Sequence, residues 1–240
     1  MNLRHAQICE LGGRSEQQDT LACISEGPIL FAIVCDGLGG HMGGEQASRM
    51  AVESAVASFQ ANPVVDRETL IGHLAVAHKR VQEQQSEAPE FASMRTTAVA
   101  VLLDGAKAIW AHVGDSRLYH FREGTILTQT RDHSVPQRLA EAGEIDTAAI
   151  RFHEDRNRLL RALGSTGELK VTCSQKTPVL AGDAFLLCTD GFWEWILESE
   201  MEAGFDTDPA IWLQALEATL KAKATGDFDN YSALAISFTD

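Results

Sequence analysis

Apolar residues gather in six short runs along the chain, and turn-forming residues separate most of them. Runs of this length and composition are typical of β-strands. They span Ile29–Cys35, Thr97–Leu103, Ala108–Val113, Arg117–Phe121, Ala184–Cys188 and Ala233–Phe238. Two of the runs face each other across Asp104-Gly105, a strong hairpin signal, and another turn lies at Glu123-Gly124. The pattern predicts sheets that are largely antiparallel.

Apolar residues recur with helical spacing in three longer segments. These segments are Ala47–Gln60, Glu68–Gln85 and Pro209–Ala222. In the last one, Asp208 is suited to the N-cap and Pro209 to the first helical position. The order is strands, two helices, many strands, a helical insertion near 134–162, and then strand, helix and strand. This order disfavours a βαβ repeat and predicts an α+β fold of antiparallel sheets covered by helices.

Composition and charge restrict the class of protein. The 240 residues contain no linker-like stretch, so we expect a single domain over residues 1–240. With 20 basic and 34 acidic residues the net charge is -14, which disfavours nucleic-acid binding. Early charges leave no room for the apolar core of a signal peptide, and the longest apolar run is too short for a bilayer. The five cysteines include no CxxC pair, which is typical of reduced cysteines in a cytosolic protein. Together these features predict a cytoplasmic protein without membrane contact.

Two carboxylates follow apolar runs directly and are themselves followed by glycine. Asp36 comes after the run that ends at Cys35, and Asp190 comes after Cys188-Thr189. A carboxylate at the end of a buried strand is held by the core, and the glycine lets backbone come close to a bound ion. One Asp-Gly pair alone is more simply a turn, and Asp104-Gly105 is interpreted in that way. Two pairs at strand ends indicate a site for a hard cation.

Two further aspartates strengthen this interpretation. Asp115 lies between two predicted strands, and Asp229 lies just before the last one. Aspartates that converge in a partly buried site repel one another, and bound cations would neutralise them. Oxygen ligands without a suitably spaced His/Cys set favour Mg²⁺ or Mn²⁺ over Zn²⁺.

The chain resembles the type 2C metal-dependent serine/threonine protein phosphatases, in particular bacterial stand-alone members. The resemblance extends over nearly the whole chain as eight ordered motifs. They are Arg14-Ser15-Glu16-Gln17-Gln18-Asp19, Asp36-Gly37-Leu38-Gly39-Gly40-His41-Met42-Gly43-Gly44-Glu45, Thr96-Thr97, Gly114-Asp115-Ser116-Arg117-Leu118-Tyr119, Asp132-His133-Ser134, Arg161-Ala162-Leu163-Gly164, Thr189-Asp190-Gly191-Phe192-Trp193-Glu194 and Asp229-Asn230. Any one of these motifs is a weak signal, whereas eight in the same order are specific.

The resemblance implies a fold and a set of metal ligands. The fold is a four-layer α-β-β-α sandwich of two antiparallel sheets flanked by helices, with a small flap at about 135–160. Two Mn²⁺ or Mg²⁺ ions are expected, with a third, weaker ion beside them. The implied ligands of the ion pair are Asp19, Asp36, the Gly37 carbonyl, Asp190 and Asp229, and those of the third ion are Asp115 and Glu194.

The resemblance also implies how catalysis works. Water between the two ions attacks phosphorus, so no protein nucleophile is needed, and Arg14 grips the substrate phosphate. Leaving-group protonation is left open between His41 and a metal-bound water, because the histidine that many relatives carry after Asp-Gly is Leu38 here. Glu194 is one methylene longer than the aspartate that relatives usually carry at this position. The third-ion site is therefore the part of the implied metal centre that departs most from the family pattern. His133 and Arg117 are interpreted as structural residues.

The expected function is therefore hydrolysis of phosphoserine and phosphothreonine on proteins, reversing a serine/threonine kinase. The expected partners are phosphorylated protein substrates, and the chain is expected to be a monomer. Three alternatives were weighed against this function. One is hydrolysis of small phosphoesters, another is a catalytically silent regulatory domain, and the last is a structural calcium protein. Retention of all implied ligands disfavours the silent domain, and the lack of a D-x-D-x-D-G loop disfavours the calcium protein.

Overall fold

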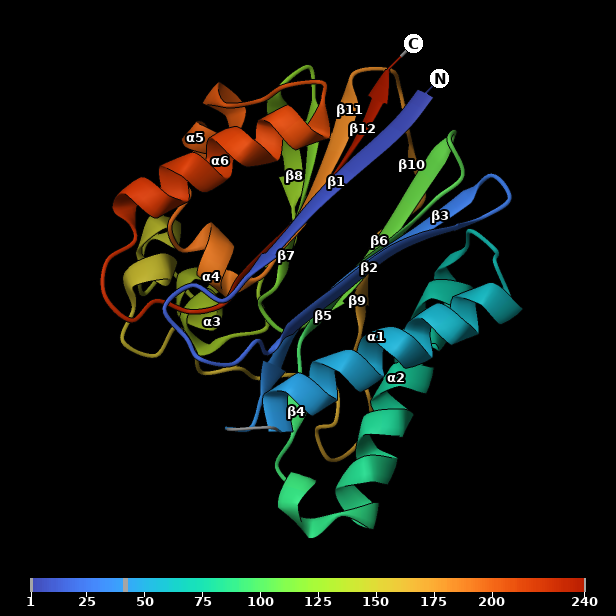
Figure 1. Cartoon of the computed structure of the whole chain (residues 1–240), viewed down its shortest axis with the longest axis vertical. Helices are drawn as coiled ribbons and strands as arrows, with labels where there is room; N and C mark the ends of the chain where they lie inside the picture. The colour runs from blue at the N-terminus through green and yellow to red at the C-terminus, as the bar shows by residue number, and fades with distance from the viewer. Residues whose placement is uncertain (1, 41–42, 240) are drawn as a thin grey trace.

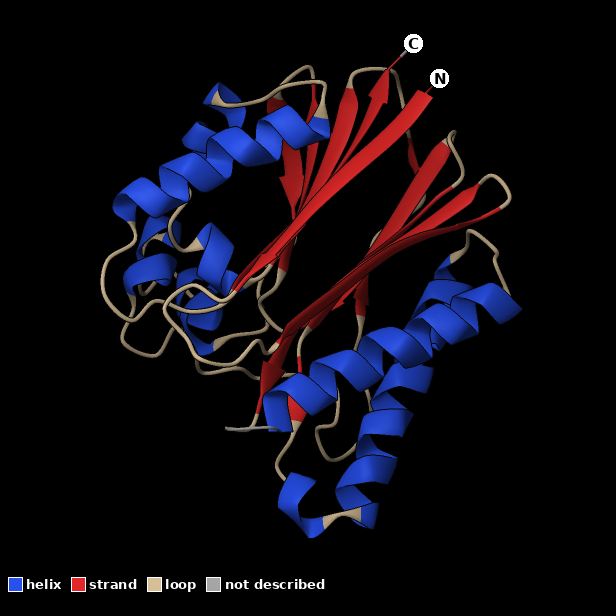
Figure 2. Ribbon diagram, in the orientation of Figure 1, coloured by secondary structure: helices blue, strands red, loops and turns tan. Residues whose placement is uncertain are grey.

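A computed structural model describes residues 2–40 and 43–239 of the chain. Two antiparallel β-sheets pack face to face, and helices cover the outer face of each sheet (Figures 1 and 2). The predicted α+β sandwich is thereby confirmed. Among the described residues, no helix is both long and apolar enough to cross a lipid bilayer.

The first sheet has five strands in the order β1-β12-β11-β7-β8. Its strands are β1 (Asn2–Glu10), β7 (Arg117–Arg122), β8 (Thr125–Gln129), β11 (Asp183–Cys188) and β12 (Tyr231–Thr239). Four helices lie on its outer side: α3 (Val135–Glu141), α4 (Asp190–Trp193), α5 (Glu198–Ala203) and α6 (Pro209–Lys223). The N-terminal and C-terminal strands are neighbours, because Asn2–Glu10 of β1 pairs with Tyr231–Thr239 of β12 along its whole length.

The second sheet has seven strands, five of them in the order β10-β6-β5-β3-β2. They are β2 (Asp19–Glu26), β3 (Ile29–Leu38), β5 (Ala98–Leu103), β6 (Lys107–Val113) and β10 (Thr177–Pro178), with β4 (Arg95–Thr96) beside β3 and β9 (Thr172–Cys173) beside β6. The helices α1 (Gly43–Ala61) and α2 (Arg67–Glu87) cover its outer face. Two short 3-10 helices, η1 (Pro89–Phe91) and η2 (Thr147–Phe152), lie in connections.

Strand β3 shows why the central strands appear as unbroken apolar runs in the sequence. Side chains alternate across a strand, so successive residues enter different cores. Phe31 and Ile33 pack with α1 and α2, whereas Ala32 and Val34 pack between the two sheets. Both faces are buried, and no position requires a polar residue. The end of such a strand is held firmly from both sides.

Several strands and part of the helical insertion differ from the predictions. The longer strands β1, β2 and β8 were not predicted, because they lie at sheet edges and their side chains are mostly exposed or half-buried, which removes the apolar signal. The insertion predicted to be helical near 134–162 includes Asp155–Arg158, and a helix there is wrong: these residues form a single turn, in which the Arg158 N–H donates to the Asp155 carbonyl. A segment of four residues is too short to sustain helical hydrogen bonds on its own.

The two ends of the flap lie side by side, so the flap begins and ends at the same place in the fold. A β-bridge joins Ser134 to Leu159, and the Val135 N–H donates to the Arg158 carbonyl. Between these points lie α3, η2 and the turn, on the same side as α4 and α5.

Candidate metal centre

The pairing of β2 with β3 places two predicted ligands side by side. Asp19, the first residue of β2, lies directly opposite Asp36 of β3 in the antiparallel register. Directly opposed residues have Cβ atoms about 4.5–5.5 Å apart, and like charges in that position destabilise a sheet. Asp19 is only 4% exposed, so water cannot screen the pair fully. The strand register therefore places two carboxylates next to each other, and a bound cation would relieve their repulsion.

Asp190 and Asp229 come to this region from the other sheet. Asp190 begins α4 just after β11, and Asp229 lies just before β12, the neighbour of β11. Gly191 keeps the two segments in contact, because a Cβ atom there would lie 2.0 Å from the Asn230 carbonyl oxygen. The glycine after Asp190 therefore serves the close approach of two backbones. This contact fixes the Asp190 and Asp229 side chains relative to each other.

Buried carboxylates influence one another's protonation across the two sheets. Burial, with repulsion from nearby carboxylates, raises the pKa of both Asp36 and Asp190 well above the usual range. Burial also raises the pKa of Asp19 to about 7 and that of Asp115 to about 8. Asp36 is repelled by each of the other three and by Asp229, which shows that all five predicted aspartates share one region.

The donor set suits hard divalent cations that keep bound water. In the described ranges 2–40 and 43–239, no three Asp, Glu, His or Cys side chains are close enough to form a complete metal site on their own. Water would therefore have to supply several ligands, as it does for Mg²⁺, which dehydrates reluctantly. The surrounding carboxylates carry the charge, and their raised pKa values show that this charge is uncompensated in the protein alone.

Arg14 lies beside the carboxylates, as predicted for a phosphate-binding residue. Its Nη2 atom is 3.2 Å from Oδ2 of Asp229, and its Nη1 atom is 4.0 Å from Oδ2 of Asp227. A cavity of about 330 Å³ opens here and is lined by Arg14, Ser15, Glu16, Gln18, Gly40, Asp229 and Asn230. The guanidinium is half-exposed and can turn from the aspartates to a bound phosphate. The predicted His41 lies outside the described residues.

Most of the chain matches a known protein family. A family model described as Protein phosphatase 2C matches residues 12–224. The chain belongs to the protein phosphatase 2C family. As a member it is a protein phosphatase, and the predicted class of enzyme is confirmed.

Similar proteins are bacterial phosphatases of this family. Serine/threonine phosphatase stp of Listeria welshimeri is 32% identical over 211 residues, which cover 86% of this chain and 83% of the relative. The crystal structure of the Mycobacterium tuberculosis serine/threonine phosphatase PstP/Ppp has a TM-score of 0.87 and 26% identity, and the match covers 99% of both chains. The catalytic domain of PstP in complex with two manganese ions has a TM-score of 0.85 at 25% identity over 99% of both chains.

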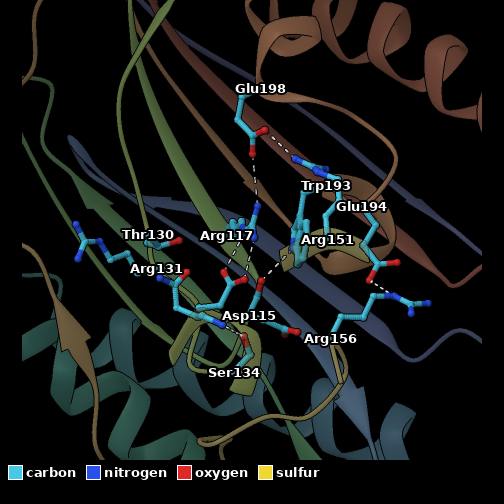
Figure 3. Close-up of polar contacts among 12 residues, drawn as sticks. Asp115, Arg117, Thr130, Arg131, Ser134, Arg151, Arg156, Trp193, Glu194 and Glu198 are labelled. Atoms are coloured by element: carbon cyan, nitrogen blue, oxygen red, sulfur yellow. Dashed lines mark hydrogen bonds and ion pairs between the residues drawn. The ribbon is translucent and has the colours of Figure 1, made fainter. Parts of the chain in front are cut away.

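The fifth aspartate of this protein phosphatase 2C domain is held by a neighbouring network (Figure 3). The carbonyl of Asp115 accepts a hydrogen bond from the indole N–H of Trp193 at 3.0 Å. The Arg117 guanidinium stacks over the Trp193 ring and makes two hydrogen bonds to Asp132, at 2.9 and 2.8 Å. Arg151 of the flap donates to the Trp193 carbonyl from the other side. Arg117 is thus structural, as predicted, and Trp193 joins the flap to the Asp115 loop.

Glu194, the predicted ligand of a third ion, is already bound by an arginine. Its charge contributes to the raised pKa values of Asp115 and Asp190, so it is close to both. Arg156 of the flap donates to Glu194 at 2.8 Å (Figure 3). A third cation that used Glu194 would have to compete with this ion pair.

Three threonines and one asparagine position the aspartates, and sequence reasoning did not assign these roles. Thr96 donates to the Asp36 carbonyl at 2.7 Å, Thr97 Oγ1 accepts from the Asp36 N–H at 2.9 Å, and Thr189 donates to the Asp19 carboxylate at 2.9 Å. The motifs Thr96-Thr97 and Thr189-Asp190 contained the signal, but hydroxyl direction depends on the tertiary structure.

Asn230 joins the loop that carries Arg14 to the last strand. Its side chain donates to the carbonyls of Leu11 and Glu16, each at 2.9 Å, and accepts from the Gln18 N–H at 2.9 Å. These three bonds use one acceptor and both donors of the amide. Asn230 therefore fixes the position of Arg14 relative to Asp229.

His133 also has a structural role, as predicted. Its Nδ1 atom accepts from the Gly114 N–H at 3.2 Å, and its ring stacks on His112 at 4.5 Å. Burial, His112 and Arg161 lower the pKa of His133 to about 3, so it stays neutral and is poorly suited to exchange protons near pH 7.

Proposed function

We propose that this protein hydrolyses phosphoserine and phosphothreonine on other proteins with the help of two Mn²⁺ or Mg²⁺ ions. The observation that carries the proposal is the convergence of five aspartates from both sheets beside Arg14. Their mutual repulsion in a buried setting is a cost that divalent cations remove. Family membership and the names of the relatives agree with this activity.

Each residue has a defined part in the proposed reaction. Asp19, Asp36, the Gly37 carbonyl, Asp190 and Asp229 would hold the ion pair. A divalent cation held by these residues would supply an acidified water and compensate charge on the phosphoryl oxygens. Arg14 binds two phosphate oxygens through its planar guanidinium and orients the phosphoryl group for in-line attack. His41 stays a prediction for protonation of the leaving group.

The position of the Arg14 side chain beside Asp229 couples substrate binding to ion binding. Without substrate, the guanidinium is paired with Asp229, a proposed ligand. A phosphate that takes over the guanidinium leaves both Asp229 oxygens to the ion. The thermodynamic consequence is that phosphate and cation favour each other's binding.

The deciding experiment is manganese-dependent phosphate release from phosphothreonine peptides, with p-nitrophenyl phosphate and small phosphorylated metabolites as comparisons. We expect peptide turnover that ends when a chelator removes the metal. Full activity after exhaustive chelation would exclude the ion-based reaction, and a preference for metabolites would exclude the protein substrate class. The substrates are expected to be cytoplasmic phosphoproteins that a serine/threonine kinase modifies, with the enzyme acting as a monomer.

A further inference from the structure

A second cavity carries positive charge that the metal centre does not use. It has a volume of about 460 Å³ and lies between the start of the flap and the segment that follows it. Four cationic side chains line it: Arg131, Arg138, Arg161 and Lys170. Such a concentration is unusual here, because the chain has 34 acidic residues and only 20 basic ones. An anionic ligand is the natural partner of a site with this charge.

The two acidic side chains in the cavity wall do not neutralise these cations. Asp132 is bound by Arg117 through two hydrogen bonds. Glu141 pairs with Arg138 at 3.9 Å. In residues 2–40 and 43–239, Arg131, Arg161 and Lys170 have no carboxylate within 4.0 Å. Three positive charges therefore stay uncompensated around one cavity.

Arg161 in particular lacks a good acceptor. His133 Nδ1 accepts from the Gly114 N–H, so in the neutral ring Nε2 carries the proton and donates to Thr172 Oγ1 at 2.8 Å. The Nη1 atom of Arg161 is 3.1 Å from the same Nε2, so two donors face each other. Within the described residues, the other polar contact of the Arg161 side chain is a long one, 3.4 Å to Thr172 Oγ1. An oxyanion in the cavity would supply the acceptors that this guanidinium lacks.

The cavity walls are bonded to the backbone of the metal centre. On one side, Gly114, the neighbour of Asp115, donates to His133 and its carbonyl accepts from the His133 N–H at 2.8 Å. On the other side, Leu163, two residues after Arg161 of the cavity wall, forms a β-bridge with Thr96, and Thr96 donates to the Asp36 carbonyl. The cavity is therefore connected through short bonded segments to Asp115 and Asp36, and it is separate from the cavity that Arg14 lines.

We propose that this cavity binds a second anionic group of the polypeptide substrate, a phosphate or an acidic side chain near the phosphoresidue that reacts. This inference rests on the proposed function and adds a substrate preference to it. The phosphate that is hydrolysed binds at Arg14, and the second anion binds at Arg131, Arg161 and Lys170. Figure 3 shows the Arg131 guanidinium directed away from Arg117, with no dashed contact to the other residues drawn.

The test compares three series of phosphothreonine peptides that share one parent sequence. The series place a phosphoserine, a glutamate or a glutamine, one position per peptide, two to six residues on either side of the phosphothreonine. In the wild-type protein loaded with Mn²⁺, we expect kcat/KM to be roughly five-fold higher with the second anion at its preferred position, as for two exposed ion pairs. Higher salt should reduce this preference by screening it. A comparison of kcat/KM between the phosphoserine and glutamate peptides shows whether the cavity prefers a phosphate or an acidic side chain.

Arg131→Gln/Lys170→Gln removes two exposed charges from the cavity and leaves the residues of the metal centre unchanged. We expect this variant to lose the preference while it hydrolyses p-nitrophenyl phosphate at the wild-type rate. The matched control is Lys79→Gln/Arg80→Gln on α2, which changes the net charge equally and should keep the preference. Equal hydrolysis of all peptides by wild type, or an equal loss in the control, overturns the inference. Absence of all peptide hydrolysis would instead overturn the proposed function.

Discussion

The Nε atom of Arg156 in the flap lies 2.8 Å from Oε1 of Glu194, the proposed ligand of a third, weaker ion. The ion pair holds the flap to α4 and also adds a positive charge beside the site. Removal of this charge by Arg156→Gln should tighten the weakest Mn²⁺ binding step by roughly five-fold, as expected for a partly exposed pair. Calorimetric titration with Mn²⁺ would measure the change.

Arg158→Gln is the matched control, because Arg158 lies in the same turn and pairs with Asp155 at 3.9 Å instead of with Glu194. Unchanged Mn²⁺ binding in Arg156→Gln would show that Glu194 takes no part in ion binding. Equal changes in both variants would point to the general charge of the flap.

Asp36→Asn should abolish ion binding and stabilise the metal-free protein. The substitution removes a carboxyl group whose ionisation in the folded protein is opposed by burial and by four other aspartates, which raise its pKa. We expect nearly undetectable turnover, no heat of Mn²⁺ binding at the strong sites, and a Tm for the metal-free protein a few degrees above wild type. Asp155→Asn in the flap turn serves as the control. Wild-type turnover on a phosphothreonine peptide would contradict the role of Asp36.

Arg14→Ala should weaken substrate binding without loss of the ions. The variant keeps every proposed ligand but lacks the guanidinium that grips phosphate, so KM should rise about ten-fold or more with a smaller fall in kcat. Calorimetry should show that Mn²⁺ still binds, and at least as tightly as in wild type, because the ion no longer competes with Arg14 for Asp229. Arg4→Ala, which removes an exposed arginine paired with Asp208, should change neither constant. A variant of Arg14 that no longer bound Mn²⁺ would contradict this division of roles.

Stability of the metal-free protein should fall as the pH rises from 7 to 8.5. The folded-state pKa of Asp115 is about 8, far above the value near 4 of an unfolded aspartate. In this range the folded protein still holds a proton that the unfolded chain has lost, and this advantage disappears as the pH passes 8. Asp115 alone should lower the Tm by about 3 °C over this range, and Mg²⁺ should largely remove the dependence. Asp115→Asn should make the metal-free profile shallower, with the rest of the slope due to Asp36 and Asp190, whose pKa values are also raised. An unaltered profile would assign the whole effect to those groups.

The sequence predicts the central strands well, because their two buried faces require apolar residues at every position. Ile29–Leu38 and Asp183–Cys188 are examples, and the aspartates at their ends follow from the same pattern. Edge strand β1 gave no comparable signal, since most of its residues are exposed or half-buried.

Side-chain partners in the site depend on contacts distant in sequence. Arg156 and Glu194 are 38 residues apart, and no local pattern links them. Asn230 donates hydrogen bonds to Leu11 and Glu16, which are more than 200 residues away in the sequence. The sequence shows that Asn230 belongs to the Asp229-Asn230 motif, but it does not show which residues Asn230 contacts. The strand-end pattern predicted that Asp36, Asp115, Asp190 and Asp229 gather, and the family resemblance added Asp19 and Arg14. The hydrogen-bond directions required the folded structure.

The alignment of β1 with β12 has a consequence for biosynthesis. Asp19 follows β1 and Asp229 precedes β12, so the ribosome makes the first of these two proposed ligands long before the second. While β12 is still in the exit tunnel, the five-stranded sheet lacks the strand between β1 and β11. We therefore expect the metal centre to stay incomplete on a nascent chain until β12 has emerged and paired with both neighbours.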